Sequence, residues 1–414
     1  MSSVRELAAK VREAATRLTL LTTEEKNDAL MKIADALEDN RGMILARNRE
    51  DVERERAGGM SESLLDRLSL NEKRISAMAE GVRQVAALPD PVGEIIDETV
   101  RPNGLRIRRV RVPVGVIGMI FEARPNVSVD SASLAIKAGS GIILRGSRSA
   151  AVSNRALVDV MKEALGGTAV PPDSIGLSAS ASHEDVEEMM RLRGMIDLII
   201  PRGGAGLIQS VCENSRVPVL ETGVGNCHVY IHADADPDMA ERIAVNAKCS
   251  RPSVCNAAET LLFHRDKTDI LPRICRALGD RGVTVHGCPV TRSLFPEAVE
   301  ATEEDFFREY LSLDIAVKVV DSLEDAIAHV RKYSSGHTEA IVAKDPAAAE
   351  KFMREIDSAC VNHNASTRFT DGFEFGFGAE IGISTQKLHA RGPVGLRELT
   401  SYKYLVTGDG QVRE

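Results

Sequence analysis

The first ninety residues carry apolar side chains at helical spacing. Between residues 4 and 18 they recur every three or four positions, which is the period of one helix face. A second helix is predicted after Thr22, because Glu25 lies three positions later and completes a capping box. Prolines at 89 and 91 and the glycine at 93 then end the helical pattern. We therefore predict a helical N-terminal segment.

From residue 114 onward, short apolar runs alternate with helical patterns. We predict buried strands at 114–121, 141–144, 174–177 and 195–200, with helices at about 126–138, 150–165 and 183–192. This alternation predicts a parallel sheet with right-handed crossovers and helices on both faces. Such sheets bind ligands beyond the carboxyl ends of their strands, so a nucleotide cofactor is plausible.

A second α/β unit is predicted to begin near Glu221. It has strand patterns at 228–231, 258–263 and 314–320, and a helix pattern at about 323–333. The segment from Phe373 to Gly382 is rich in glycine and phenylalanine and is expected to be a loop. Residues 402–406 are expected to form a last strand.

A hairpin is predicted at Asn103-Gly104, a pair that favours a tight primed turn, followed by an alternating strand at 105–112. Five arginines lie between 101 and 111. They are interpreted either as the solvated face of an amphipathic strand at a subunit contact or as a nucleic-acid-binding patch. The net charge of −9 favours the first interpretation.

The composition excludes several other classes. Aromatic residues make up 4% of the 414 residues and tryptophan is absent, which argues against a protein that stacks nucleic-acid bases. Seven cysteines in a long chain do not resemble a disulfide framework. The chain begins without the apolar run of a signal peptide, and its longest apolar run is too short to span a membrane. We expect a cytoplasmic protein that binds neither membranes nor nucleic acids.

Two segments could carry chemistry. Gly203 and Gly204 lie between a predicted strand and a predicted helix, where backbone N–H groups can approach a phosphate, although an ordinary turn is equally consistent. Cys255 follows a loop that contains Arg251, so its thiol is either a reactive thiolate or a small buried side chain. Cysteines 249 and 255 and the histidine at 264 lack the spacing of a zinc site, so no metal is expected.

Longer motifs resemble a known superfamily. The segment 219–226 (VLETGVGN) contains Glu221, and Cys255 follows 34 residues later, as in the glutamate and nucleophile segments of aldehyde dehydrogenases. Asn126 stands where that superfamily places an asparagine after a strand. Residues 320–341 (VDSLEDAIAHVRKYSSGHTEAI) more narrowly resemble the signature of the gamma-glutamyl phosphate reductase (glutamate-5-semialdehyde dehydrogenase) family. The segments GMIFEARPNVSVD, ETGVGNCH and GFGAEIGISTQKLHARGP are also similar to that family.

The resemblance implies an aldehyde-dehydrogenase-like α/β fold. It implies a Rossmann-like cofactor domain at 1–98 and 114–221 and an α/β catalytic domain at 222–378. A small β oligomerisation flap would combine 99–113 with 385–414. The flap gives the arginine-rich strand a structural role in a homo-oligomer.

The resemblance also implies an oxidoreductase of proline biosynthesis. It would reduce L-glutamyl 5-phosphate to L-glutamate 5-semialdehyde with NADPH and release phosphate, and glutamate 5-kinase is a possible partner. Cys255 would form a thioester, and the Asn126 amide with the Cys255 backbone N–H would stabilise the oxyanion. Glu221 matches a glutamate that activates water in hydrolytic relatives. Water would destroy the thioester here, so Glu221 is expected to position groups or to act as an acid, and its role is left open.

The cofactor assignment rests on two arginines. Arg145 and Arg148 align with positions where NAD-dependent members carry a lysine for the ribose and an acidic residue for the 2′-hydroxyl. Guanidinium groups there favour the 2′-phosphate of NADPH. Glu309 resembles the family's ribose-contacting glutamate, and His337 is expected either to contact substrate or to make a structural hydrogen bond. A hydrolytic aldehyde dehydrogenase and, more remotely, a nucleic-acid-binding module that uses the 101–111 arginines remain the alternatives.

Overall fold

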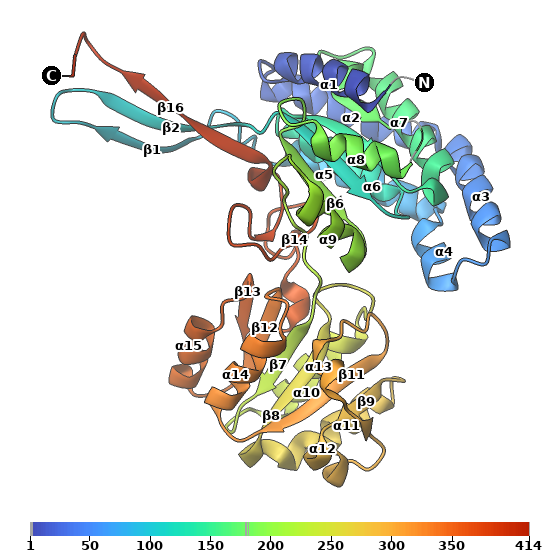
Figure 1. The fold of residues 1–414 in the computed structure, drawn as a ribbon, viewed down its shortest axis with the longest axis vertical. Coiled ribbons are helices and arrows are strands. Elements are labelled where there is room, and N and C mark those ends of the chain that lie inside the picture. The colour runs from blue at the N-terminus through green and yellow to red at the C-terminus, as the bar shows by residue number, and fades with distance from the viewer. Residues whose placement is uncertain (1–2, 179, 181, 414) are drawn as a thin grey trace. The chain divides into compact units, whose positions relative to one another are not determined.

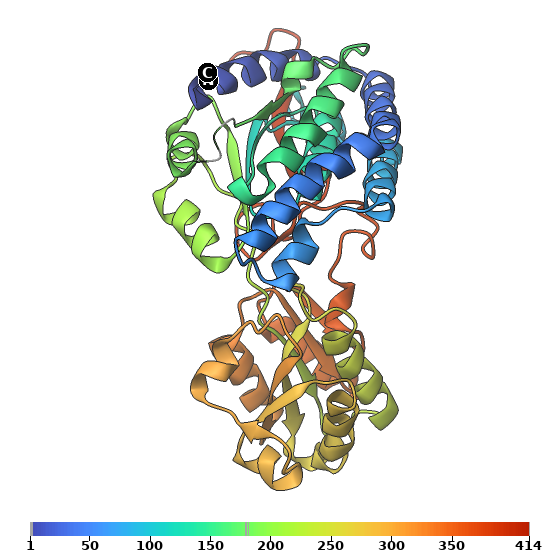
Figure 2. The same cartoon turned by 90° about the vertical axis from the view of Figure 1, so that its right-hand side faces the viewer.

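The computed structural model describes residues 3–178, 180 and 182–413 (Figures 1 and 2). The chain divides into two compact units. The first comprises residues 1–221, 376–382 and 394–414, and the second comprises 222–375 and 383–393. The assignment of a cofactor domain, a catalytic domain and an oligomerisation flap to this chain stays a prediction.

Five helices open the first unit, as the sequence pattern predicts. They are α1 (Val4–Leu18), α2 (Thr23–Asp39), α3 (Arg41–Ala57), α4 (Glu62–Leu68) and α5 (Glu72–Ala87). The predicted capping box at the start of α2 is confirmed. The Thr22 side chain accepts a hydrogen bond from the Glu25 N–H, and the Glu25 carboxylate accepts one from the Thr22 N–H at 2.8 Å.

The first unit contains the predicted parallel sheet. Its strands are β3 (Val116–Phe121), β4 (Gly141–Arg145), β5 (Ile175–Leu177) and β6 (Leu198–Arg202), in the order β5-β4-β3-β6. The chain runs outward from β3 to β5 and then returns to the other side of β3 as β6. The strand order therefore reverses between β3 and β6, the place where open α/β sheets bind ligands.

Helices cover this sheet on both faces. The connecting helices are α6 (Asn126–Lys137), α7 (Ala151–Leu165) and α8 (His183–Arg191), and α9 (Ala205–Asn214) follows β6. Apolar residues of α1, α8 and α9 form one buried cluster with alternate residues of β3, β4 and β6. Helices α6 and α7 belong to the opposite layer, where α2 and α5 pack against them. The predicted strand and helix positions are confirmed to within a few residues.

Three antiparallel strands form a separate sheet in the first unit: β1 (Ile95–Val100), β2 (Arg106–Pro113) and β16 (Thr400–Thr407), in the order β1-β2-β16. The prediction of a tight primed turn at Asn103-Gly104 is wrong. The Gly104 N–H bonds to the Arg101 carbonyl at 2.9 Å, and the Arg101 N–H bonds to the Leu105 carbonyl at 2.8 Å, so the loop has three residues. Gly104 takes a positive φ of 85° but Asn103 does not, whereas a type I′ turn needs a positive φ at both central residues.

The second unit is built on a seven-stranded parallel sheet. Its order is β10-β9-β11-β8-β7-β12-β13. The strands are β7 (Cys227–Ile231), β8 (Ala258–His264), β9 (Thr284–Gly287), β10 (Val299–Glu300), β11 (Asp314–Val320), β12 (Thr338–Val342) and β13 (Cys360–His363). Sequence analysis found β7, β8 and β11 but missed the other four. β9, β10 and β13 have two to four residues each, too few to show a periodicity.

Two helical layers cover the second sheet. α10 (Pro237–Cys249) and α11 (Leu271–Gly279) pack in one buried cluster with β7, β8 and β11, and α14 (Leu323–Tyr333) and α15 (Pro346–Glu355) pack in another. α12 (Pro289–Leu294), α13 (Glu303–Phe307) and the short antiparallel pair β14 (Ile383–Ser384) and β15 (Gly392–Pro393) complete the unit. In the described part of the chain, no helix has the length and apolar character needed to cross a membrane.

Candidate active site

Cys255 lies in a turn between α10 and β8, as the loop signal of Pro252 and Ser253 predicts. The turn is closed by a hydrogen bond from the Ala257 N–H to the Val254 carbonyl at 3.0 Å. The Cys255 side chain is partly exposed. The side chain is therefore not fully buried, although the cysteines at 249, 288 and 360 have the same intermediate burial.

Gly225, just before β7, and Cys227, its first residue, both contact the backbone of Cys255. The Cys227 thiol donates to the Cys255 carbonyl oxygen at 3.2 Å. Burial raises the pKa of Cys227 well above its ordinary value, so this thiol keeps the proton that it donates. Gly225 packs so closely that a Cβ atom there would lie 1.5 Å from the same carbonyl oxygen. The position of the Cys255 backbone is therefore fixed from one side.

Glu309 reaches this same part of the second unit. Its carboxylate accepts a hydrogen bond from the Gly225 N–H at 2.7 Å. A fully buried ion pair lies close by, in which Lys248 Nζ is 2.6 Å from a carboxylate oxygen of Glu259. The other Glu259 oxygen accepts from the Leu311 N–H at 3.4 Å, two residues after Glu309. The pair thus ties the segment that carries Glu309 to the start of β8.

His337 makes structural contacts. The side chain is fully buried, its Nδ1 lies 2.8 Å from the Thr338 hydroxyl, and the Cys227 thiol lies 3.7 Å from the same nitrogen. These contacts favour the structural interpretation of His337 over direct contact with a substrate.

Asn126 is the first residue of α6, directly beyond the carboxyl end of β3. Its amide nitrogen donates to the carboxylate of Asp130, one turn later, at 2.9 Å. Burial raises the pKa of Asp130 to about 6, and the hydrogen bond from Asn126 opposes part of that shift. Asp130 therefore fixes the orientation of the Asn126 amide.

Gly203 and Gly204 join β6 to α9 at the point where the strand order reverses. The Gly204 N–H donates to the carboxylate of Glu122, which follows β3, at 2.9 Å. A Cβ atom at Gly203 would lie 2.7 Å from the same carboxyl group. The glycines thus permit a close approach of backbone and side chain, and the group approached in this structure is Glu122.

Glu221 ends the first and longest segment of the first unit and is partly buried. Its negative charge contributes to raising the pKa of Cys212 on α9, after the larger effect of burial. The structure therefore gives Glu221 an electrostatic neighbour in its own unit, and its chemical role stays a prediction.

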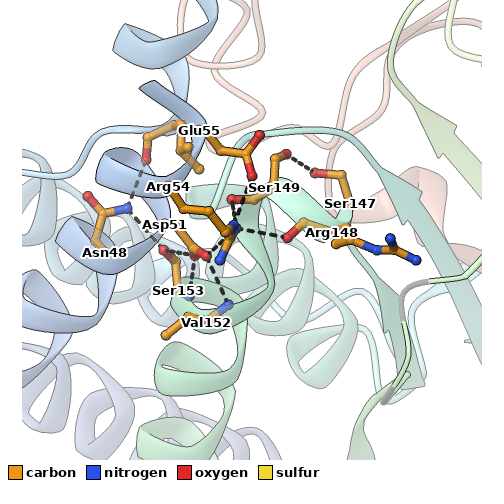
Figure 3. A network of polar contacts seen from close by, with 10 residues as sticks. Asn48, Asp51, Arg54, Glu55, Ser147, Arg148, Ser149, Val152 and Ser153 are labelled. Atoms are coloured by element: carbon orange, nitrogen blue, oxygen red, sulfur yellow. Dashed lines mark hydrogen bonds and ion pairs between the residues drawn. The ribbon is translucent and has the colours of Figure 1, made fainter. Parts of the chain in front are cut away.

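The two predicted cofactor arginines differ in accessibility. The Arg145 side chain is 8% exposed, and its guanidinium donates to the Ser182 carbonyl at 2.8 Å. Arg148 is exposed, and its side chain points away from the polar network around α3 (Figure 3). In that network Arg54 donates to the carbonyl oxygens of Arg148 and Ser149 at 3.1 and 3.0 Å. Of the two arginines, Arg148 is therefore the more accessible.

Charge pairing explains the arginine-rich strand β2. On β2, Arg106 pairs with Glu98 at 3.4 Å and Arg109 pairs with Asp97 at 2.6 Å, both acids lying on β1. Arg111 pairs with Glu94, the residue before β1, at 2.9 Å. The acidic partners offset the positive charge of these arginines, which weakens their attraction for phosphate groups. The structure supports the amphipathic-strand interpretation and weakens the nucleic-acid alternative.

Comparison with known proteins decides the family. Residues 2–279 match the family model described as the aldehyde dehydrogenase family. The chain is 58% identical over 414 residues to the gamma-glutamyl phosphate reductase of Carboxydothermus hydrogenoformans, with 100% of both chains covered. It is 53% identical to the crystal structure of gamma-glutamyl phosphate reductase from Thermotoga maritima, with a TM-score of 0.97 and full coverage of both chains. The chain belongs to the gamma-glutamyl phosphate reductase family.

The predicted resemblance to the gamma-glutamyl phosphate reductases and the predicted aldehyde-dehydrogenase-like fold are confirmed. An acetylating aldehyde dehydrogenase from Geobacillus thermoglucosidasius, 18% identical over 99% of this chain and 97% of its own, has a TM-score of 0.71 and shares the fold. Sequence analysis missed Arg368, whose guanidinium donates to the Asn256 side chain beside Cys255. An arginine in the motif ASTRFTDG has no periodicity or spacing that would have identified it.

Proposed function

We propose that the chain catalyses the NADPH-dependent reduction of L-glutamyl 5-phosphate to L-glutamate 5-semialdehyde with release of phosphate, a step of proline biosynthesis. The observation that carries this proposal is the 58% identity, over the full length of both chains, to a protein named gamma-glutamyl phosphate reductase. A partly exposed cysteine in a loop whose backbone is fixed by Gly225 and Cys227 supports it.

Cys255 is the nucleophile in this proposal. Its sulfur forms a bond to the γ-carbonyl carbon, the bond from that carbon to the phosphate oxygen breaks, and the bonding electrons leave with phosphate. The thiol proton ends on the departing phosphate. The product of this step is a thioester on Cys255.

In this proposal the Asn126 amide stabilises the substrate's carbonyl oxygen. Addition to the carbonyl places negative charge on its oxygen, and an amide N–H that is already oriented stabilises that charge most effectively. Asp130 provides the orientation by accepting one amide hydrogen of Asn126, which leaves the other hydrogen for the oxyanion.

The first unit has features that fit a nicotinamide cofactor. The carboxyl ends of β3, β4 and β6 meet at one edge of the parallel sheet, and Gly203 leaves space at that edge that a Cβ atom would fill. Arg148 presents an exposed guanidinium that suits a 2′-phosphate. The ribose is assigned to Glu309 of the second unit, on the resemblance to the family alone. When bound, the cofactor supplies the hydride that reduces the thioester.

The proposal extends to assembly and location. The sheet β1-β2-β16 exposes apolar side chains along an open strand edge, which supports a homo-oligomer formed through this flap. The cysteines of the described chain form no disulfide, which fits the reducing cytoplasm. Contact with glutamate 5-kinase, which makes the labile acyl phosphate, belongs to the same proposal.

The deciding experiment runs the reaction in reverse. Glutamate 5-semialdehyde is incubated with NADP⁺, or with NAD⁺, at increasing concentrations of inorganic phosphate, and reduced cofactor is measured by absorbance. The proposal predicts that the rate requires phosphate and is higher with NADP⁺. Strong turnover without phosphate contradicts it and supports a hydrolytic aldehyde dehydrogenase.

A further inference from the structure

Two arginines flank the nucleophile within the second unit. Arg251 lies four residues before Cys255 in the loop that follows α10. Arg368 comes from a distant segment, a single helical turn at Thr367–Phe369. Neither arginine has a role in the function proposed above.

The Arg368 guanidinium bridges the two ends of the loop that carries Cys255. Its Nε donates to the Ser250 hydroxyl at 3.2 Å, at the start of the loop. Its Nη1 donates to the side-chain oxygen of Asn256, at the end of the loop. The Asn256 amide in turn donates to the Thr370 carbonyl at 2.9 Å. One guanidinium group is therefore hydrogen-bonded to both ends of the Cys255 loop.

Both positive charges lack an acidic partner. Among the described residues, no carboxylate lies within the 4.0 Å of an ion pair from Arg251 or Arg368. The nearby Asp371 uses its carboxylate to accept backbone hydrogen bonds from Phe373 and Glu374, at 3.0 and 3.5 Å. A bound anion would supply the negative charge that the described residues do not place against these two guanidinium groups.

The electrostatics of Arg368 agree with this geometry. Burial lowers its pKa first, and the positive charge of Arg251 lowers it further, while the charges of Asp371 and Cys255 act in the opposite direction. Arg251, Arg368 and Cys255 are therefore close enough to interact through their charges. A guanidinium stays protonated despite such a shift, so the site remains cationic.

We propose that Arg251 and Arg368 together form the subsite that holds the phosphoryl group of the acyl-phosphate substrate and, in the reverse direction, inorganic phosphate. This inference rests on the proposed function. A dianionic phosphoryl group matches two guanidinium groups in charge, and guanidinium binds phosphate oxygens through paired hydrogen bonds. As the bond between carbon and phosphate oxygen breaks, negative charge grows on the departing phosphate, and the two arginines stabilise it.

The experiment measures the KM for inorganic phosphate in the reverse reaction. Arg251→Gln is the main variant, because Arg251 is exposed and makes no hydrogen bond or ion pair within the described chain, so the fold does not depend on it. Loss of one charge-assisted contact should raise the KM for phosphate about tenfold to a hundredfold. The KM values for semialdehyde and NADP⁺ should change less than twofold. Arg276→Gln, at an exposed and unpaired site on α11 of the described structure, is the matched control and should match the parent.

A second readout separates phosphate binding from loop structure. Alkylation of Cys255 by iodoacetamide, followed by mass spectrometry of its peptide, should be slowed by inorganic phosphate in the parent but not in Arg251→Gln. Arg368→Lys keeps the charge but cannot bridge Ser250 and Asn256, so it should also raise the KM for phosphate. If Arg368→Lys fails to fold by circular dichroism, the Arg251 variant decides alone.

The possible failures are distinguishable. A parent enzyme without phosphate-dependent turnover contradicts the proposed function itself. A phosphate-dependent parent whose KM for phosphate and whose protection of Cys255 are unchanged in Arg251→Gln overturns the inference and leaves the function intact.

Discussion

Gly225 and Cys255 are packed so tightly that no side chain fits between them: a Cβ atom on Gly225 would lie 1.5 Å from the Cys255 carbonyl oxygen. Real Cβ atoms do not approach backbone oxygens this closely, so any larger residue at 225 must displace the loop. Gly225 also donates to Glu309. A glycine in the segment ETGVGN therefore limits where the backbone of Cys255, 30 residues later in the chain, can lie.

Gly225→Ala should lower kcat by about a hundredfold, because a displacement of about 1 Å at reacting groups costs roughly that factor. Gly279→Ala is the control, since nothing lies within 4 Å of a Cβ atom at Gly279. The measurement is the steady-state rate with thermal unfolding recorded in parallel. A Gly225→Ala enzyme with the kcat of the parent would show that the close packing does not position Cys255.

Asp130 makes stability depend on pH. Its pKa rises from an ordinary value of 3.8 to about 6 in the folded protein, because burial disfavours the charged carboxylate. The folded state therefore binds the proton more tightly than the unfolded state. This contribution to stability is complete below about pH 4 and is lost as the pH rises through 6.

Asp130→Asn should remove that dependence while keeping an acceptor for the Asn126 amide. Between pH 4 and 7, the Tm of the variant should rise relative to the parent by an amount on the order of a few degrees. Asp159→Asn, an exposed site on α7, should follow the parent at every pH. Parallel curves for Asp130→Asn and the parent would mean that Asp130 titrates normally.

Arg148 should determine the choice of nicotinamide cofactor. A guanidinium bonded to the 2′-phosphate contributes about 1.5–3 kcal/mol per charge-assisted hydrogen bond. Arg148→Glu should therefore raise the KM for NADPH about tenfold to a hundredfold and leave the KM for NADH unchanged. Arg49→Glu, at an exposed position of α3, controls for the change in charge. Equal behaviour of Arg148→Glu and Arg49→Glu would exclude Arg148 from recognition of the 2′-phosphate.

The flap should form a subunit contact through β16. Tyr404 and Val406, each 58% exposed, lie on an edge strand, where exposed apolar groups favour association. Replacing both with Asp should reduce the mass measured by light scattering while the helical content stays constant. Val110 is a poorer test site because it is only 8% exposed within one chain, so its replacement would also disturb the sheet. An unchanged mass would place the subunit contact elsewhere.

The strength of each sequence pattern explains which predictions succeeded. The strand 141–145 contains a continuous apolar run, and the helix 151–165 has apolar residues at helical spacing. Each pattern favours one type of secondary structure, and both elements were predicted. The turn at Asn103-Gly104 was predicted wrongly, because local preference favours a two-residue loop while pairing of Arg101 with Leu105 fixes a three-residue loop. Tertiary pairing decided between two turns that the same residues allow.

Candidate site residues could be named from the sequence only where a motif or a glycine marked them. Cys255 and Asn126 stand in recognisable segments. The accessibility of Arg145 and Arg148 depends on their contacts with Ser182 and α3, which are distant in the sequence. Arg368 is joined to the Cys255 loop across more than a hundred residues of sequence. Contacts of that kind arise from the folded sheet and leave no local pattern to read.

One comparison of initial rates tests whether Cys255 is the nucleophile. Cys255→Ala and Cys249→Ala are assayed with glutamate 5-semialdehyde, NADP⁺ and phosphate, and cofactor binding and unfolding are measured for both. We expect Cys255→Ala to lose activity by a factor on the order of 10³ or more while it binds cofactor and folds like the parent. Cys249→Ala should keep most of its activity. Comparable losses in the two variants, or substantial turnover by Cys255→Ala, would contradict this role of Cys255.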